Sequence, residues 1–129
     1  MSVNWQTVAD WIDTEGTIAS YIMSSREGGV VRRRKSYIAI SQTDKEPLEK
    51  LCEFMRGEGI TCSIYRLREG REFELKIIRV KDVEKVVNTI EPYILTGRKK
   101  AQIERFRRFR AEIGTPIDTS SFLKAAAVV

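Results

Sequence analysis

A stretch near the start of the chain, Trp5 to Gly16, limits the possible folds more than any other part of the sequence. Its apolar residues recur at helical spacing and share one face: Trp5, Val8, Ala9 and Ile12. Glycine tolerates a left-handed backbone, so we expect Gly16 to end this helix in that conformation. The next residues alternate like a strand. The sequence therefore predicts a short amphipathic helix that ends beside a carboxylate, Glu15, and leads directly into a strand.

The composition excludes several kinds of site. The 129 residues include no histidine, which excludes Cys/His zinc sites and histidine-based triads. Any metal ion would need oxygen ligands, as Mg²⁺ does. Two isolated cysteines in apolar contexts, Cys52 and Cys62, predict reduced core residues. With neither a membrane span nor a signal-peptide pattern, the expected location is intracellular, either cytoplasmic in a prokaryote or organellar.

The charge balance favours a polyanionic partner. Lys and Arg number 23 against 18 Asp and Glu, giving a net charge of +5 and an isoelectric point of about 9.4. Nucleic acid is the first expectation and an anionic membrane the second. The alternative is the solvated surface of a thermostable protein. An unbroken basic run, Arg32 to Lys35, favours nucleic acid.

Turn and cap signals divide the chain into helices and paired strands. After the first helix we expect a hairpin with strands at 17–25 and 30–42 around a turn at 26–29. A helix capped by Asp44, a second hairpin at 60–79, a helix capped by Asp82 and a basic helix at 98–113 follow. This order predicts one α+β domain over residues 1–114. Residues 115–129 are weakly patterned and read as a frayed or vector-derived tail.

The expected strands have one apolar and one polar face. In the first hairpin Ile38 and Ile40 share the core face, whereas the opposite face carries Arg33, Lys35 and Tyr37. In the second hairpin we assign Tyr65, Leu67, Phe73, Leu75 and Ile77 to the core. The outward side chains are then Arg66, Arg68, Glu72, Glu74 and Lys76. Such a sheet would suit a polyanion, although ordinary half-exposed strands would look similar.

The motif VADWIDTEG at residues 8–16 resembles the LAGLIDADG motif of homing endonucleases. Residues 37–43 resemble the family's second strand, which often closes on a glutamine, and residues 91–102 resemble the start of its last helix. The resemblance covers about residues 4–113. It implies an αββαββα subunit whose curved antiparallel four-stranded sheet binds DNA and is backed by helices. The sequence departs from the family at Asp10. The family has a small residue at this position, which lets two motif helices approach closely.

The resemblance implies a site-specific double-strand DNA endonuclease of a mobile intron or intein. It would hydrolyse phosphodiesters with Mg²⁺ at a long pseudo-palindromic site. The chain has one motif and no internal repeat, so the implied enzyme is a homodimer joined through the helix Trp5 to Asp13. Double-stranded DNA is the implied partner, with no membrane and no small-molecule substrate. The alternatives are an RNA maturase or a cleavage-deficient DNA-binding regulator, but the retained acid favours cleavage.

The resemblance also assigns roles within the site. Glu15 and the backbone carbonyl of Thr14 would bind Mg²⁺, while Asp13 would serve structure near the helix end. Gln42, with Lys45 beside it, fits the position that orders water, although a polar strand end is an equal interpretation. We expect Asp10 to point into its own subunit or to find a basic partner.

A basic residue near the scissile phosphate is also implied, and counting back from Ala101 puts it at Gly97. Lys99 is the first substitute and Arg98 the second, because Lys99 shares a helical face with the apolar stripe. Lys100 would reach a phosphate at the rim, although all three could be ordinary phosphate contacts. The expected base contacts in the major groove are Arg33, Lys35, Tyr37, Arg66, Arg68 and Lys76.

Overall fold

The computed structural model describes residues 2–25 and 31–113. The turn expected at 26–29 and the tail at 115–129 lie outside these residues. The elements in chain order are α1 (Trp5–Glu15), β1 (Gly16–Ser25), β2 (Val31–Gln42), α2 (Lys45–Gly57), β3 (Ser63–Leu67), η1 (Arg68–Gly70), β4 (Glu72–Ile77), α3 (Val80–Ile90), η2 (Glu91–Tyr93) and α4 (Gly97–Ala111). The predicted α+β order is confirmed. No helix in the described ranges has the length and hydrophobicity to cross a bilayer.

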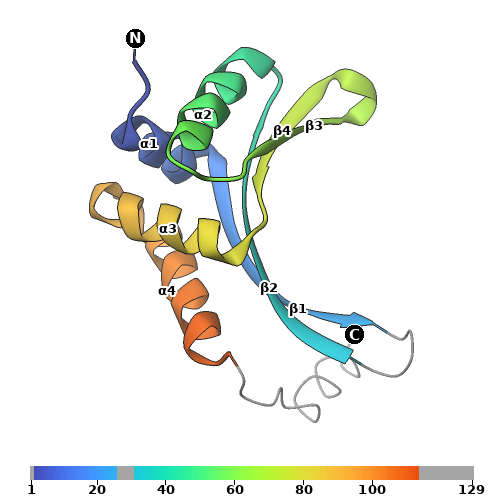
Figure 1. Ribbon diagram of the computed structural model, residues 1–129, viewed down its shortest axis with the longest axis vertical. Coiled ribbons are helices and arrows are strands. Elements are labelled where there is room, and N and C mark those ends of the chain that lie inside the picture. The colour runs from blue at the N-terminus through green and yellow to red at the C-terminus, as the bar shows by residue number, and fades with distance from the viewer. Residues whose placement is uncertain (1, 26–30, 114–129) are drawn as a thin grey trace.

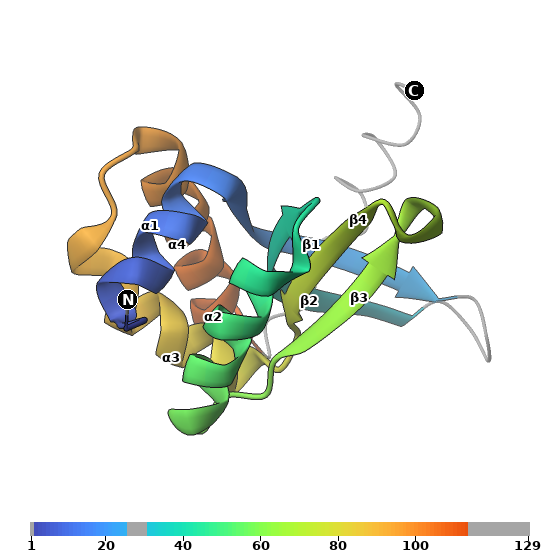
Figure 2. The same cartoon turned by 90° about the horizontal axis from the view of Figure 1, so that it is seen from above.

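The four strands form one antiparallel sheet in the order β1-β2-β4-β3. All helices lie on the same side of it, and the two hairpins bend away from them, so that the uncovered face is concave (Figures 1 and 2). The covered face supplies a core of fully buried side chains: Ile38, Ile40, Leu75 and Ile77 from the sheet, and Val8, Ile12, Leu48, Met55, Val83 and Ile90 from the helices. Each fully buried aliphatic side chain contributes about 1.5–3 kcal/mol, so the helices hold the sheet in its curved form.

Both ends of α1 are set by its own sequence. Asn4 caps the start, because its side chain accepts a hydrogen bond from the Thr7 amide at 2.9 Å and the Thr7 hydroxyl accepts one from the Asn4 amide. At the other end Gly16 ends the helix as predicted, but its φ of −98° is not left-handed. Its Cβ would instead lie 2.8 Å from Ile12 Cα and 3.3 Å from the Ala39 carbonyl oxygen. Glycine is needed there because two backbones approach closely.

The outer edge of β1 is covered by α4. The Ile18 amide donates to Gln102 Oε1 at 2.8 Å, and Arg105 Nε donates to the Ser20 carbonyl at 2.9 Å. Two backbone groups of an edge strand, which would otherwise be open to another strand, are therefore paired by helix side chains.

The core assignment in β3 is wrong by one residue. Ile64 pairs with Leu75 and Arg66 with Phe73, and Ile64 and Phe73 pack against the core, so Arg66 is on the helix side. Its guanidinium lies 5.9 Å from the centre of the Phe73 ring. Tyr65, expected in the core, is 46% exposed on the concave face because successive strand residues alternate between faces.

Two other residues do not have the structural positions that the sequence predicts. Arg68 is outside the strand, in η1 with a positive φ of 45°, and its guanidinium pairs with Glu72 at 3.4 Å. Asp82 does not cap α3, which begins at Val80. The Asp82 carboxylate instead accepts a hydrogen bond from the Thr61 amide at 3.1 Å, so it joins α3 to the segment before β3.

Candidate active site and nucleic-acid interface

The concave face carries the predicted basic and aromatic side chains of the central strands. Arg33, Lys35 and Tyr37 alternate with residues facing the helices, as expected. The Lys76 ammonium lies 4.7 Å from the centre of the Tyr37 ring, close enough for a cation–π interaction. The face assignment of these four residues is confirmed, and their contact with DNA stays a prediction.

Sequence reasoning missed several residues of this face. Tyr21, Met23 and Tyr65 are each at least 40% exposed there. The Tyr21 ring contacts that of Tyr37 edge-on, with centroids 6.0 Å apart. The period-two alternation of the first strand contained the signal for Tyr21 and Met23. These side chains give the face flat apolar surface among its charges, which suits contacts to base edges and thymine methyl groups.

The side chains of the basic run Arg32 to Lys35 alternate between the two faces of the sheet. Arg34, next to Arg33, lies on the helix side and pairs with Glu112 at 3.6 Å with a side chain only 14% exposed. The concave face therefore receives only alternate residues of the run that the sequence presents as continuous.

Glu15 is the last residue of α1 and is exposed. Gly16 pairs with Ile40, so Gln42 lies two residues further along β2, half-buried at the strand end. Helix C-terminal carbonyls lack partners within their own helix. The Thr14 hydroxyl donates back to the Asp10 carbonyl at 2.8 Å. A carboxylate and a carbonyl of the last turn are oxygen donors of the kind that Mg²⁺ accepts.

One chain offers only part of a metal site. Within residues 2–25 and 31–113, no three side chains among His, Cys, Asp and Glu are grouped to hold a metal ion. A hard cation at Glu15 would therefore need further oxygen ligands from DNA, water or a second copy of the chain.

Asp13 ties the end of α1 to the start of α4. Its carboxylate accepts hydrogen bonds from the Leu95 amide at 2.8 Å, the Thr96 amide at 3.3 Å and the Thr96 hydroxyl at 2.6 Å. The structural role expected for Asp13 is confirmed. Burial alone would raise the pKa of Asp13, but the hydrogen bonds from Thr96 and Leu95 and the charge of Lys99 bring it below its usual value.

We expect Asp13→Asn to lower the free energy of unfolding by about 1–2 kcal/mol at neutral pH, because charged acceptors of hydrogen bonds are lost. The lowered pKa means that the carboxylate stabilises the fold fully above the unfolded value, about 3.9. That stabilisation is lost as pH falls through the folded value. Urea unfolding at several pH values should show the difference from the parent shrinking in acid. The exposed acid Glu53, changed to Gln, is the control, and an equal difference at pH 3 and pH 7 would contradict the assignment.

The cations at the start of α4 differ in burial. Lys99 is 3% exposed and shares the inner face with Ile103 and Phe106, as expected. Burial first, and then the charge of Arg98, lower the pKa of Lys99, whereas Asp13 opposes the shift. Arg98 and Lys100 are exposed. Lys99 is therefore held near Asp13 at the α1–α4 junction, and its two neighbours are exposed to solvent.

Two further expectations concern single residues. Asp10 is exposed rather than turned into its own subunit, and among the described side chains no ion pair joins it to a cation; it lies on the outer face of α1, where a second chain could supply one. Lys45 pairs with Glu49 at 3.7 Å and lies 5.9 Å from the Phe73 ring centre. These contacts hold Lys45 at the start of α2. Its expected role beside Gln42 in ordering water stays a prediction.

No family model and no curated protein sequence matches this chain. Among solved structures, the homing endonuclease I-TnaI superposes with a TM-score of 0.71 at 21% identity, covering 96% of this chain and 84% of that one. The archaeal intron-encoded homing endonuclease I-Vdi141I, complexed with DNA, gives 0.67 at 22% identity over 86% and 69%.

A third similar structure bears the motif name itself. The LAGLIDADG homing endonuclease I-GzeII, in complex with its DNA target, superposes with a TM-score of 0.70 at 22% identity. The alignment covers 88% of this chain but 37% of I-GzeII, so this chain corresponds to less than half of that protein. With its helix α1, curved four-stranded sheet and backing helices, the chain therefore has the fold of the LAGLIDADG homing endonucleases.

Proposed function

We propose that the protein is a site-specific, Mg²⁺-dependent double-strand DNA endonuclease of a mobile intron or intein. The observation that carries this proposal is an exposed carboxylate, Glu15, at the last residue of a helix that leads directly into a concave, basic sheet. An acid at a helix C-terminus is locally unfavourable, and a broken local preference without a local gain is typical of a functional site.

The concave face supports DNA as the substrate. Its exposed cations, Arg33 and Lys35, carry charges suited to phosphates and to guanine edges. The likeness in fold to proteins solved in complex with DNA supports the same partner. The sheet would sit against the major groove, which admits a two-stranded β-ribbon.

At the catalytic end, Glu15 and the Thr14 carbonyl would hold Mg²⁺. A bound Mg²⁺ supplies Lewis-acid polarisation of the scissile phosphate. The half-buried Gln42 amide would orient water at the strand end, and Lys99 would offset negative charge near the junction. All four groups belong to the segments that meet where α1, β1, β2 and α4 come together.

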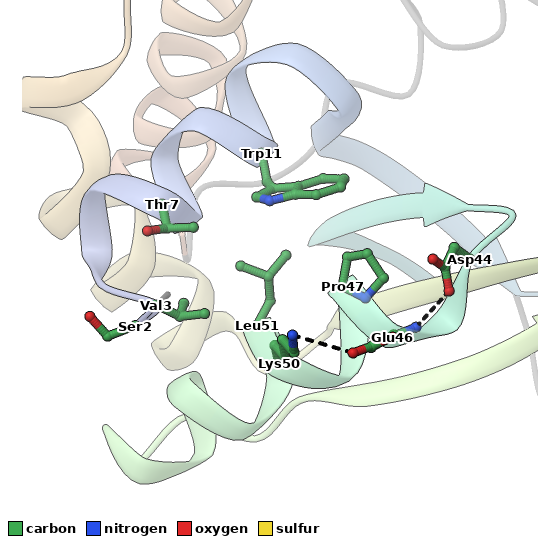
Figure 3. Close-up of a pocket in the computed structure, with 9 residues that line it drawn as sticks. All are labelled: Ser2, Val3, Thr7, Trp11, Asp44, Glu46, Pro47, Lys50 and Leu51. Carbon is green, nitrogen blue, oxygen red and sulfur yellow. Dashed lines mark hydrogen bonds and ion pairs between the residues drawn. The ribbon is translucent and has the colours of Figure 1, made fainter.

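A homodimer follows from the need for two catalytic carboxylates. One chain has one Glu15, and cutting both strands requires one site for each strand. The outer face of α1 borders a groove of about 360 Å³ between α1 and α2. Figure 3 shows Trp11 facing Pro47 and Leu51 across it. These apolar side chains suit a second copy packed along α1.

The test is incubation with a library of duplex DNA and Mg²⁺, followed by sequencing of the cut ends. We expect one pseudo-palindromic site and no cutting in a chelator. Light scattering of the protein on that site should give the mass of two chains per duplex. Binding without cutting would favour a regulator, and preference for structured intron RNA would favour a maturase; either result, or one chain per duplex, would overturn the proposal.

The cation at the start of α4 gives a separate prediction. Lys99→Met preserves packing and should slow single-turnover cleavage of saturating DNA by about tenfold or more, with little loss of affinity. The exposed Arg98→Met should weaken binding and reduce the salt slope by about one, as a phosphate contact would.

A side chain at Gly97 would meet open space, so Gly97→Lys should raise the cleavage rate if the family position is simply vacant here. Unchanged cleavage by both methionine variants, once bound, would mean that this site has no basic helper.

A further inference from the structure

A carboxylate lies on the face that the proposed function assigns to DNA. Leu75 and Ile77 are fully buried against the helices, so alternation puts Glu74 and Lys76 on the concave side of β4. Near a phosphate backbone a carboxylate is repelled. Its presence beside Lys76 on this face therefore needs a reason other than affinity for DNA.

Resting on the proposed endonuclease function, we propose that Glu74 is a specificity-determining residue that accepts a hydrogen bond from the amino group of a cytosine in the major groove. Cytosine presents its N4 amino donor there, whereas guanine and thymine present acceptors at the corresponding edge. Adenine has an amino group beside the acceptor N7, which a carboxylate also repels. Cytosine is the base that a carboxylate selects.

The Glu74 carboxylate is held in place but retains capacity to accept. Its Oε2 accepts from the Ser41 hydroxyl at 3.4 Å, and its Oε1 lies 3.8 Å from Lys76 Nζ. Both contacts are long, and an ionised carboxylate has about four acceptor positions. The side chain is 22% exposed. A base donor can therefore approach without displacing either neighbour.

Lys76 completes a fixed donor–acceptor pair. Its ammonium is held between the Tyr37 ring and Glu74, and the Tyr37 ring is in turn contacted by Tyr21. Lysine in the major groove prefers guanine O6 and N7. Residues two apart on a strand are separated by about 7 Å, roughly two base-pair steps. Each half-site should therefore contain a cytosine and a guanine about two base pairs apart.

The experiment is selection of bound and cut sites from a randomised duplex library by the parent protein, Glu74→Gln, Glu74→Ala and a control, Glu72→Gln. Glu72 is the next residue of this face toward the η1 bend, where Arg68 pairs with it. The parent should prefer cytosine about tenfold or more at one position of each half-site. Glu74→Gln should move that preference to adenine, because a glutamine amide reads N6 and N7 together, and Glu74→Ala should abolish it.

The outcomes separate this inference from the proposed function. If the parent enriches no duplex, the endonuclease proposal fails and this one with it. If the parent enriches a site and Glu74→Gln keeps the same preference at every position, Glu74 is not a reader and only this inference is overturned. Unchanged melting temperatures of the variants would exclude misfolding as the cause of a changed preference.

Discussion

Glu15→Gln is expected to slow cleavage of bound duplex by on the order of a thousandfold. The amide keeps the shape of the side chain but loses the charge that a hard divalent cation requires. Affinity for the duplex should be unchanged or slightly higher, because a negative charge near phosphates is removed. Single-turnover rates with saturating DNA, measured beside a binding titration, separate the two effects.

Glu53→Gln is the matched control for this experiment, because Glu53 is an exposed acid on α2, away from the α1–β1 junction. It should cut at the parental rate. Cleavage by Glu15→Gln at the parental rate in Mg²⁺ would remove Glu15 from the mechanism. The endonuclease could then stand only with a different carboxylate at its centre.

Gly16→Ala should lower the free energy of unfolding by about 3 kcal/mol, at the upper end of the cost of overpacking. The added methyl would lie 2.8 Å from Ile12 Cα and 3.0 Å from the Ile12 carbonyl oxygen. Both atoms belong to the backbone, so no side-chain rotation relieves the contact, and α1 must move away from β1. Urea denaturation provides the measurement.

Gly97→Ala is the control, since a Cβ at Gly97 has no neighbour within 4 Å. It lies at the first residue of α4, where alanine should be neutral or should stabilise by up to about 1 kcal/mol by restricting the unfolded chain. A loss at Gly16 no larger than at Gly97 would show that α1 and β1 can separate at little cost. The position of Glu15 would then be set by something other than this contact.

Local periodicity was sufficient to predict α1 and the faces of β2 and β4. It failed in β3 because either set of alternate residues is apolar enough to face the core. The two sets are Tyr65 with Leu67, and Cys62 with Ile64. The choice is made by packing under α2, where Cys62 and its neighbour Ile60 are buried. Neither the strand alone nor its hairpin partner contains that information.

The candidate site likewise contains features that local sequence predicts and features that depend on distant residues. Glu15 could be placed from the motif because its position depends on a helix end only a residue away. The Asp13 contacts with Leu95 and Thr96 join groups 82 and 83 residues apart, and no local spacing encodes such pairs. The close approach at Gly16 is equally non-local, since one of its neighbours is the Ala39 carbonyl of the next strand.

The pairing of the β1 edge by α4 has a consequence for synthesis on the ribosome. Ile18 and Gln102 are 84 residues apart, so β1 and β2 can pair well before the helix that covers their edge exists. Gln102 follows the last residue of β2, Gln42, by 60 residues, so at about 5–20 residues per second the interval is roughly 3–12 s. During that time the nascent hairpin exposes an open strand edge to its neighbours on the same messenger RNA. The open edge is therefore covered only when α4 has been made, and α4 then prevents strand pairing between nascent chains.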